Sequence, residues 1–562
     1  MTAGVREQPR GAGRPRPRPG SRLGLVGWLT GLTVLAGVGY RLWLLGHATP
    51  PTNSDEATMG LAALHIARGE GFPVWFYGQQ YMGTLEAYLA APVFALFGPS
   101  LFGLRLPTLA LYVLFLLLTW RLTLRLTGDR WFALLVVALL ALGADRVVKN
   151  QLIAGGGYPE MNAAGVALAL LAVDLAAGRP GWRLARWAVW GFLAGLLLWV
   201  DPLALPYVVA TGAVLVGFRH RELRGRAGAL LGAAAVLGAA PLLGHSLLTG
   251  RNPLHAVLAA GGADATASWA DRLHGGLLLG PPLGMGFCGA GSCATWQLWW
   301  AYALPVLLVV AAGTAWRALR HPSDADAGPR LDGSAGSGNS GGSAGSAGLA
   351  PRLAAAMRLA LVLAAAATLA AYTLSSSSGL TPVESSRYLS TLLISVPALL
   401  WPAWTLARRG GGSTAARFAG WPVARLAAVV VLAATLVTAA YATGQAARTA
   451  PATRAAEARH AELVATLRHL GVRHVRAGYW TCNRLTFASG EKVVCAVVDD
   501  TLRPGFDRYA AYRREVERAA APAWVAPTGS PLAARLDERL GAGPADLDLV
   551  TLDGWRIYLP RG

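Results

Sequence analysis

About eleven long apolar stretches constrain this chain more than any other feature of its sequence. Each has roughly 18 or more residues, the length that a helix needs to cross the ~30 Å hydrocarbon core of a bilayer. Charged residues make up only 14% of the chain, against roughly 25% in an ordinary soluble protein. We therefore expect a mainly α-helical, polytopic membrane protein. The expected spans lie near residues 23–45, 104–124, 131–149, 161–178, 184–200, 203–218, 227–247, 296–316, 354–374, 388–407 and 422–443.

Arginines predict how these spans are oriented. A net charge of +20 is typical of nucleic-acid binding in a soluble protein, but here the arginines cluster in short loops between spans, where they set orientation. The basic tail, residues 1–22, is therefore expected in the cytoplasm, as is the Gly/Ser-rich loop 317–353. Alternation across the membrane module, residues 23–443, places 46–103 and 444–562 outside.

The apolar run 84–97 is the ambiguous element of this topology. As a further span it would invert every later loop and turn the basic loops outward, against the positive-inside rule. We interpret it as a juxtamembrane or re-entrant helix on the outer face. The first run, 23–45, is interpreted as a span, because it is too long for a cleaved signal peptide and contains Arg41.

The four cysteines all fall in segments that are expected outside, where disulfides persist. Cys288 and Cys293 share one loop, and Cys482 and Cys495 lie in the C-terminal segment. The spacing C-x4-C is also half of a metal site, but no matching His or Cys pair lies nearby. We predict two local disulfides, Cys288–Cys293 and Cys482–Cys495.

The segment after residue 444 alternates between helical and strand-like patterns, which predicts a small extracytoplasmic α/β domain. Its expected helices are 452–470, 483–489, 507–519 and 531–540. Its expected strands are 474–480, 492–498, 523–525, 547–552 and 555–559.

Polar side chains gather in the first outer segment, close to the membrane exit. Asp55 and Glu56 directly follow the first span, and Ser54 is able to cap a helix that starts there; one alternative is that Asp55 is only part of that cap. A sugar stacks on aromatic rings and hydrogen-bonds to amides and carboxylates, although aromatic residues also form interfacial belts. A carboxylate in an apolar helix is costly unless it is paired or faces a polar cavity. The substrate-binding candidates here are Tyr77, Gln79, Gln80, Tyr81 and Glu86.

This arrangement resembles the first extracytoplasmic loop of the GT-C glycosyltransferases, which include protein O-mannosyltransferases and the lipid A aminoarabinose transferase. In those enzymes an Asp-Glu pair follows the first span, and juxtamembrane helices precede a sequence like FG-x-S-x4-R-x-P, here with Phe97, Gly98, Ser100, Arg105 and Pro107. Three further segments resemble parts of related bacterial proteins. These are GGGYPE at 155–160, SSRYLS at 385–390 and the stretch 479–496.

The resemblance implies transfer of a sugar from a polyprenyl-phosphate donor to a glycan, lipid or protein acceptor of the cell envelope, at the outer face of the plasma (inner) membrane. Asp55 is the candidate general base for the acceptor hydroxyl. Glu56 positions the acceptor or Asp55, or is merely solvated. Arg387 with Tyr388 is the candidate site for the donor phosphate; the alternative is an arginine that snorkels to the interface.

Two further candidates are also implied by the resemblance. Tyr158 and Glu160 are candidate substrate-binding residues, and Glu160 lies where some relatives place a second acid that sometimes ligates metal. We predict no metal site and no certain cofactor, with a divalent metal left open. From its position before Pro202 at a span end, Asp201 is expected to cap the next helix. His65 lies on the first expected juxtamembrane helix; we expect it to be structural, with a catalytic role as the alternative.

Two other functions compete with a transferase. A transporter or flippase would show repeated halves and discontinuous helices with midplane charges, and the sequence indicates neither. A catalytically inactive GT-C-like assembly subunit would keep the same motifs. No G-x4-G-K-[ST] loop occurs in the sequence, which argues against ATP-driven chemistry within this chain.

Overall fold

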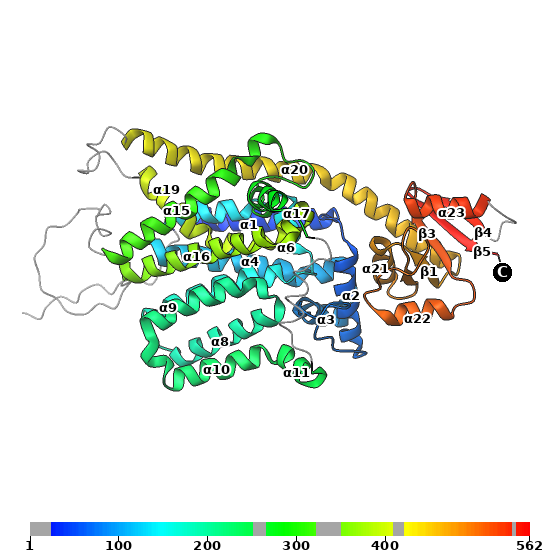
Figure 1. The fold of residues 1–562 in the computed structure, drawn as a ribbon, viewed down its shortest axis with the longest axis horizontal. Coiled ribbons are helices and arrows are strands. Elements are labelled where there is room, and N and C mark those ends of the chain that lie inside the picture. Colours follow the sequence, from blue (N-terminus) through cyan, green and yellow to red (C-terminus); the bar gives the residue numbers. More distant parts are fainter. Residues whose placement is uncertain (1–23, 251–265, 322–349, 409–420, 542–546, 562) are drawn as a thin grey trace, which may run out of the picture.

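A computed structural model shows a long helical bundle, a small α/β domain near the C-terminus, and two short helices between them (Figure 1). This architecture confirms the predicted fold class. The basic tail and most of the Gly/Ser-rich loop lie outside the part of the chain that the structure describes. The described residues are 24–250, 266–321, 350–408, 421–541 and 547–561.

Nine helices among the described residues are long and apolar enough to span a membrane, or up to eleven if each of two bent pairs counts as one span. The upper number agrees with the prediction of about eleven spans. The spans are helical because a helix satisfies its own backbone hydrogen bonds, which lipid cannot do. The nine spans are built on α1 (Leu25–Gly46), α4 (Leu101–Thr127), α7 (Tyr158–Ala176), α8 (Arg183–Val200), η1 (Pro202–Ala204) with α9 (Leu205–Leu223), η3 (Thr295–Leu298) with α15 (Trp299–Arg320), α16 (Pro351–Leu374), α18 (Pro382–Ser385) with η5 (Ser386–Ser395) and α19 (Val396–Arg408), and α20 (Trp421–His469).

The span expected at 131–149 is broken in the structure. It consists of α5 (Arg130–Ala141) and α6 (Asp145–Leu152), which meet at 90°. The fully buried guanidinium of Arg41 reaches the break and donates a hydrogen bond of 2.9 Å to the carbonyl of Ala141. The expectation of a continuous helix is wrong here, because a buried arginine needs acceptors and the interrupted backbone supplies them.

The span expected at 227–247 is also bent. Its two parts, α10 (Arg226–Gly238) and α11 (Ala240–Thr249), meet at 63°. Pro241 lies in the first turn of α11 and has no amide hydrogen with which to continue α10. We expected no discontinuous helices, which are a feature of transporters, and the two bent pairs show that this expectation is wrong. The other short helices of this module are α13 (Trp269–Leu273), the π-helical η2 (His274–Leu279), α14 (Gly280–Gly284) and α17 (Ser376–Leu380).

Two short helices separate the bundle from the C-terminal domain (Figure 1). They are α2 (Ser54–Arg68) and α3 (Leu85–Phe97). α3 contains nearly all of the ambiguous run 84–97. With 13 residues it is shorter than the roughly 17–25 residues of a membrane-spanning helix, so its length favours the juxtamembrane interpretation.

The C-terminal domain has one five-stranded sheet in the order β2-β1-β3-β5-β4. β1 pairs in parallel with β2 and β3, and β5 pairs antiparallel with β3 and β4. The domain follows the bundle without a break, because the 49-residue α20 contains both the last expected span and the helix expected at 452–470. Its elements are β1 (His474–Ala477), α21 (Tyr479–Ala488), β2 (Val494–Val497), α22 (Ala510–Arg518), β3 (Ala523–Pro527), α23 (Pro531–Gly541), β4 (Leu547–Leu552) and β5 (Trp555–Pro560).

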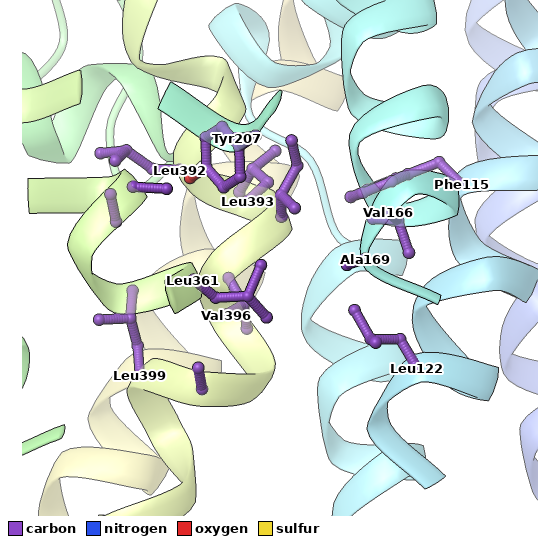
Figure 2. Packing of buried hydrophobic residues seen from close by; sticks show 14 of the residues in the cluster. Phe115, Leu122, Val166, Ala169, Tyr207, Leu361, Leu392, Leu393, Val396 and Leu399 are labelled. Carbon is purple, nitrogen blue, oxygen red and sulfur yellow. The ribbon is translucent and has the colours of Figure 1, made fainter. Parts of the chain in front are cut away.

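Aliphatic and aromatic side chains fill the interior of the bundle. Figure 2 shows Phe115 and Leu122 of α4 near Val166 and Ala169 of α7, with a second group from α9, α16, η5 and α19 beside them. That second group includes Tyr207, Leu361, Leu392, Leu393, Val396 and Leu399. Such packing holds the helix ends, and the polar residues on them, in fixed relative positions.

A separate buried cluster joins α2 and α3 to the C-terminal domain. Ala57 of α2 and Phe94 of α3 belong to the same cluster as Phe487 of α21 and Tyr512 of α22. A Cβ atom added to Gly60 would lie 2.6 Å from the ring of Phe487, so α2 approaches the domain too closely for a larger residue. The domain is therefore packed against α2 as well as connected through α20.

Candidate active site

Asp55 lies in the first turn of α2, the helix that Figure 1 shows between the bundle and the C-terminal domain. The residue that caps α2 is Asn53, whose side chain accepts the amide of Glu56 at 2.8 Å. Ser54, which is also able to cap a helix, donates instead to the backbone carbonyl of Tyr479 at 2.7 Å. Asp55 is therefore not the capping residue, and its carboxylate makes other contacts.

Those contacts come from the C-terminal domain. Oδ1 of Asp55 accepts hydrogen bonds from the Tyr479 hydroxyl at 2.6 Å and from Nη2 of Arg508 at 2.8 Å. Nε of Arg508 also donates to the Tyr479 hydroxyl oxygen at 2.6 Å. Burial and the charge of Asp55 raise the pKa of Tyr479, so its hydroxyl keeps its proton and stays a donor. A carboxylate of α2 is thus held by two side chains of the C-terminal domain.

Glu56 points elsewhere and is fully buried. Its two oxygens accept hydrogen bonds of 2.6 Å from Nε and Nη2 of Arg105, which is also buried. Arg105 is the arginine of the FG-x-S-x4-R-x-P sequence. Of the roles left open for Glu56, the solvated one is wrong, because a buried bidentate ion pair fixes its side chain between α2 and α4.

Glu86 is buried at the start of α3 and receives backbone amides from the GGGYPE segment. Its oxygens accept from the amides of Gly155 (2.5 Å), Gly156 (3.3 Å) and Gly157 (3.3 Å). Gly155 and Gly157 have φ of 138° and 66°, a backbone that favours glycine. Burial raises the pKa of Glu86 to about 7, against the opposing effect of these amides. Glu160, in the first turn of α7, is also buried.

Arg387 lies in η5 with its guanidinium 5.4 Å from the centre of the Tyr388 ring. Its charge interacts with the side chains of Tyr158, Tyr388 and Asp55. The structure therefore brings together Asp55 of α2, Tyr158 of α7, and Arg387 and Tyr388 of η5, which are three separate segments of the chain.

Tyr81 and Asp201 border the same cluster. The side chain of Tyr81 interacts electrostatically with Tyr388, Asp201, Arg508 and Arg387, and burial raises its pKa. Asp201 accepts the amide of Leu203 at 2.8 Å, so it caps η1 as predicted. Burial raises the pKa of Asp201 to about 7, against the effects of that amide and of Arg387.

The side chain of Tyr77 belongs to a second cluster, although its backbone carbonyl accepts a hydrogen bond from Arg508. Its hydroxyl lies 2.7 Å from Nδ1 of His65, and Nε2 of His65 lies 2.9 Å from Glu491 of the C-terminal domain. Gln80 is exposed and Gln79 is half-buried. Neither amide side chain has a hydrogen bond to another described residue, so the structure does not join them to the Asp55 cluster.

Both predicted disulfides are present. Cys288 is bonded to Cys293, and Cys482 is bonded to Cys495. The second bond joins α21, which carries Tyr479, to β2.

One group within the described ranges brings three possible metal ligands together. The ligand atoms of His65, Glu70 and Glu491 lie within 4.8 Å of one another. Arg68 forms ion pairs with both Glu491 and Glu70 there, and so supplies the positive charge that a cation would bring. Glu160 is not a member of this group.

The chain was compared with known protein families, curated proteins and solved structures, and only the solved structures gave matches. No family model and no curated protein matches the sequence. Among solved structures, ArnT from Cupriavidus metallidurans bound to undecaprenyl phosphate is 14% identical, with a TM-score of 0.54, and the match covers 95% of this chain and 98% of that one. ArnT is a glycosyltransferase of the GT-C superfamily. This chain has the GT-C fold.

A likeness at this identity shows the fold alone, as does the match to apo ArnT from the same organism at 13% identity and a TM-score of 0.54, over 94% of this chain and 98% of that one. The archaeal oligosaccharyltransferase AglB from Archaeoglobus fulgidus, in complex with an inhibitory peptide and a dolichol-phosphate, is 12% identical over 95% of this chain and 74% of its own, with a TM-score of 0.46. The low identities show why short motifs, rather than overall similarity, carried the prediction of the GT-C fold.

Sequence reasoning missed two residues that this GT-C fold brings to the site. Tyr479 and Arg508 are separated from Asp55 by 424 and 453 residues. Tyr479 is the first residue of the stretch 479–496, which resembles a segment of related proteins, but that resemblance assigns no role to Tyr479. No pattern in the sequence distinguishes Arg508 from the other arginines of the domain.

Proposed function

We propose that this protein is a membrane glycosyltransferase that moves a sugar from a polyprenyl-phosphate donor to a cell-envelope acceptor, with Asp55 as the general base. The observation that carries the proposal is the Asp55 carboxylate, fixed by Tyr479 and Arg508 and within electrostatic range of Arg387. A base and a cation must lie close together when one substrate loses a proton while the other releases an anionic phosphate.

The reaction assigns a role to each of these groups. The acceptor hydroxyl attacks the anomeric carbon and its proton passes to the Asp55 carboxylate. The bond between the anomeric carbon and the phosphate oxygen breaks, and its electron pair leaves with the polyprenyl phosphate. Arg387 binds the phosphate and stabilises its developing charge, while the ring of Tyr388 packs near the guanidinium.

The neighbouring residues would bind the sugar. Tyr81 and Tyr158 provide rings and hydroxyls beside Arg387. Glu86 and Glu160 provide a buried pair of acids at the start of α3 and α7. Of the other substrate-binding candidates, Tyr77 has its hydroxyl engaged by His65, which favours a structural role for it.

The fold is consistent with a lipid-linked donor. ArnT, whose structure contains undecaprenyl phosphate, shares this fold over nearly its whole length. We further propose that the site lies at the outer face of the plasma membrane, because the expected inside loops are rich in arginine.

A flippase is the second candidate, and the two bent spans favour it, since discontinuous helices are common in transporters. However, the buried charge at the α5–α6 break is fully engaged. Arg41 donates to Gln151 and to the carbonyls of Gly37, Ala141 and Leu142. Because all its nitrogens already have protein acceptors, this arginine is a structural group rather than a free ligand site.

The test is transfer by the full-length protein carrying Asp55→Asn. Deletion of the gene and mass spectrometry of envelope glycans, lipids and proteins would first identify the acceptor class. Asp55→Asn should lower the rate roughly 10²–10⁴-fold, the usual effect of losing a general base, without lowering membrane abundance. Arg387→Ala should also weaken donor binding, because it removes a phosphate contact in both ground and transition states.

Asp129→Asn provides a matched control. Asp129 also sits at a helix N-terminus and pairs with an arginine, Arg408, but it lies between α4 and α5, outside the proposed site. It should keep near-wild-type transfer. Full turnover by Asp55→Asn would contradict the proposal, and translocation without sugar transfer by the wild-type protein would favour the flippase.

A further inference from the structure

Arg508 is the cation closest to the proposed base, although it belongs to the soluble domain. Resting on the proposed function, we propose that Arg508 is a positioning residue that holds Asp55 in its reactive orientation, so that the soluble domain completes the active site of the membrane module. The observations concern the geometry of the carboxylate, the support of the arginine, and the packing between the two domains.

The hydrogen bonds to Asp55 leave one oxygen available. Tyr479 and Arg508 both donate to Oδ1. Among the described residues, no hydrogen-bond donor reaches Oδ2. A carboxylate fixed through one oxygen presents the other in a defined direction, which is what proton abstraction from an acceptor hydroxyl requires.

Arg508 is itself held rigidly. Its three guanidinium nitrogens are all used, because Nε donates to Tyr479, Nη2 to Asp55, and Nη1 to the backbone carbonyl of Tyr77 at 3.4 Å. The guanidinium carbon also lies 4.6 Å from the centre of the Phe76 ring. A planar fork with five donors can make these contacts together, and a lysine cannot.

The pair is shielded from solvent more than an ordinary surface ion pair. The side chains of Arg508 and Asp55 are 9% and 18% exposed. Most surface ion pairs contribute little because water screens them, whereas partly buried pairs keep their geometry. The Gly78 backbone packs against the same loop, where a Cβ atom would lie 3.2 Å from the Arg508 Cα.

The alternative is that Arg508 only fastens the domain to α2. The two roles differ in how its loss combines with loss of Asp55. If Arg508 acts through Asp55, its removal matters little once Asp55 has been replaced, because coupled residues are not additive. If it only stabilises docking, its removal costs the same in both backgrounds.

The experiment is a double-mutant cycle in the full-length protein, with Asp55→Asn, Arg508→Ala and their combination. The donor is the polyprenyl-phosphate sugar pool extracted from cells that lack the gene, and the acceptor is the envelope of the same cells. Sugar transfer is followed by mass spectrometry at varied donor concentration, which separates kcat from KM. Arg484→Ala is the control. Arg484 lies in α21, the helix that carries Tyr479, and pairs with Glu457, but it does not contact Asp55.

We expect Arg508→Ala to lower kcat about 10- to 100-fold with little change in donor KM, and less than about 3-fold in the Asp55→Asn background. Added guanidinium should restore part of the rate of Arg508→Ala, and Arg484→Ala should stay near wild type. If Arg508→Ala fails to accumulate in membranes, Arg508→Lys and Tyr479→Phe replace it in the same cycle, because each removes part of the contact and keeps side-chain bulk.

Several results would overturn the inference. Equal losses in both Asp55 backgrounds, or no loss at all, would show that Arg508 does not act through Asp55. A loss that guanidinium does not rescue and that tracks a lowered thermal stability would assign Arg508 to docking alone. Absence of transfer by the wild-type protein, or full transfer by Asp55→Asn, would instead remove the proposed function and the inference with it.

Discussion

At the scale of single residues, Asp55 and Glu56 are adjacent in the chain but have opposite surroundings. Side chains of consecutive helical residues point about 100° apart, so Asp55 reaches the C-terminal domain while Glu56 turns into the bundle. Asp55 is partly exposed and bound through one oxygen, whereas Glu56 is buried with both oxygens on Arg105. The first arrangement suits a base, and the second suits a structural anchor between α2 and α4.

Replacement of Glu56 should therefore affect stability first. Glu56→Gln leaves a buried guanidinium without its anion, which typically costs about 3–5 kcal/mol. We expect reduced membrane abundance and a lower unfolding temperature in detergent, with partial recovery in Glu56→Gln/Arg105→Met. Asp174→Asn is the control, because its pair with Arg125 is more exposed. A stable Glu56→Gln protein with no transfer would instead assign Glu56 to the chemistry.

At the scale of elements, two helical segments differ from what apolar length predicted: one expected boundary between helices is absent, and one expected continuous span is broken. The continuous α20 carries Pro451 within it and connects the last span to the domain, while α5 and α6 separate around Arg41. Apolar length alone cannot predict either result, because it ignores which polar group must be satisfied at a given depth. The strands and helices of the C-terminal domain follow the predicted order more closely, because their alternating patterns are local.

The Cys482–Cys495 disulfide joins two elements, α21 and β2, and its contribution can be tested separately. Cys482→Ser/Cys495→Ser should lower the stability of the domain by ~2–4 kcal/mol, and loosen the helix that carries Tyr479. Peptide mapping under non-reducing conditions should find Cys482 linked to Cys495 in the wild type. Cys288→Ser/Cys293→Ser should leave the domain unaffected, since that bond lies in the membrane module. Two thiols that alkylate readily without reductant would contradict the pairing.

At the scale of the whole molecule, the C-terminal domain and the bundle meet across α2 through an apolar cluster and a polar one. In the polar cluster, His65 of α2 and Tyr512 of α22 hydrogen-bond to Glu491, and Arg68 of α2 pairs with it. Burial opposes ionisation of Glu491, but these partners lower its pKa from 4.5 to about 2. The interface thus depends on an ionised carboxylate.

Docking should therefore weaken in acid. A carboxyl whose pKa is lowered on folding stabilises the folded state above its ordinary pKa, and this stabilisation is lost as the pH falls from about 4.5 toward about 2. Glu491→Gln should lower the unfolding temperature at neutral pH and flatten its pH dependence in that window. Glu515→Gln is the control, because its pair with His474 is exposed. Identical pH profiles for Glu491→Gln and wild type would contradict this role.

The orientation of the whole molecule is the remaining prediction. Arginine-rich loops predict that a reporter fused after Gly562 is active only outside the cell and that one inserted beside Ser337 is active only in the cytoplasm. An alkaline phosphatase and a fluorescent-protein fusion at each position would measure this. A cytoplasmic C-terminus would mean that one span is miscounted, with α3 the first to reconsider.

The sequence by itself determined the helical membrane architecture, the α/β pattern of the last domain and the pairing of cysteines, because all three depend on local periodicity and short spacing. It also indicated Asp55 as a candidate, through its place after the first span. Only the tertiary structure decided that Glu56 is bound to Arg105, that glycine amides hold Glu86, and that Tyr479 and Arg508 reach Asp55. These contacts join residues 49 to 453 positions apart, and a single sequence carries no signal for packing across such separations.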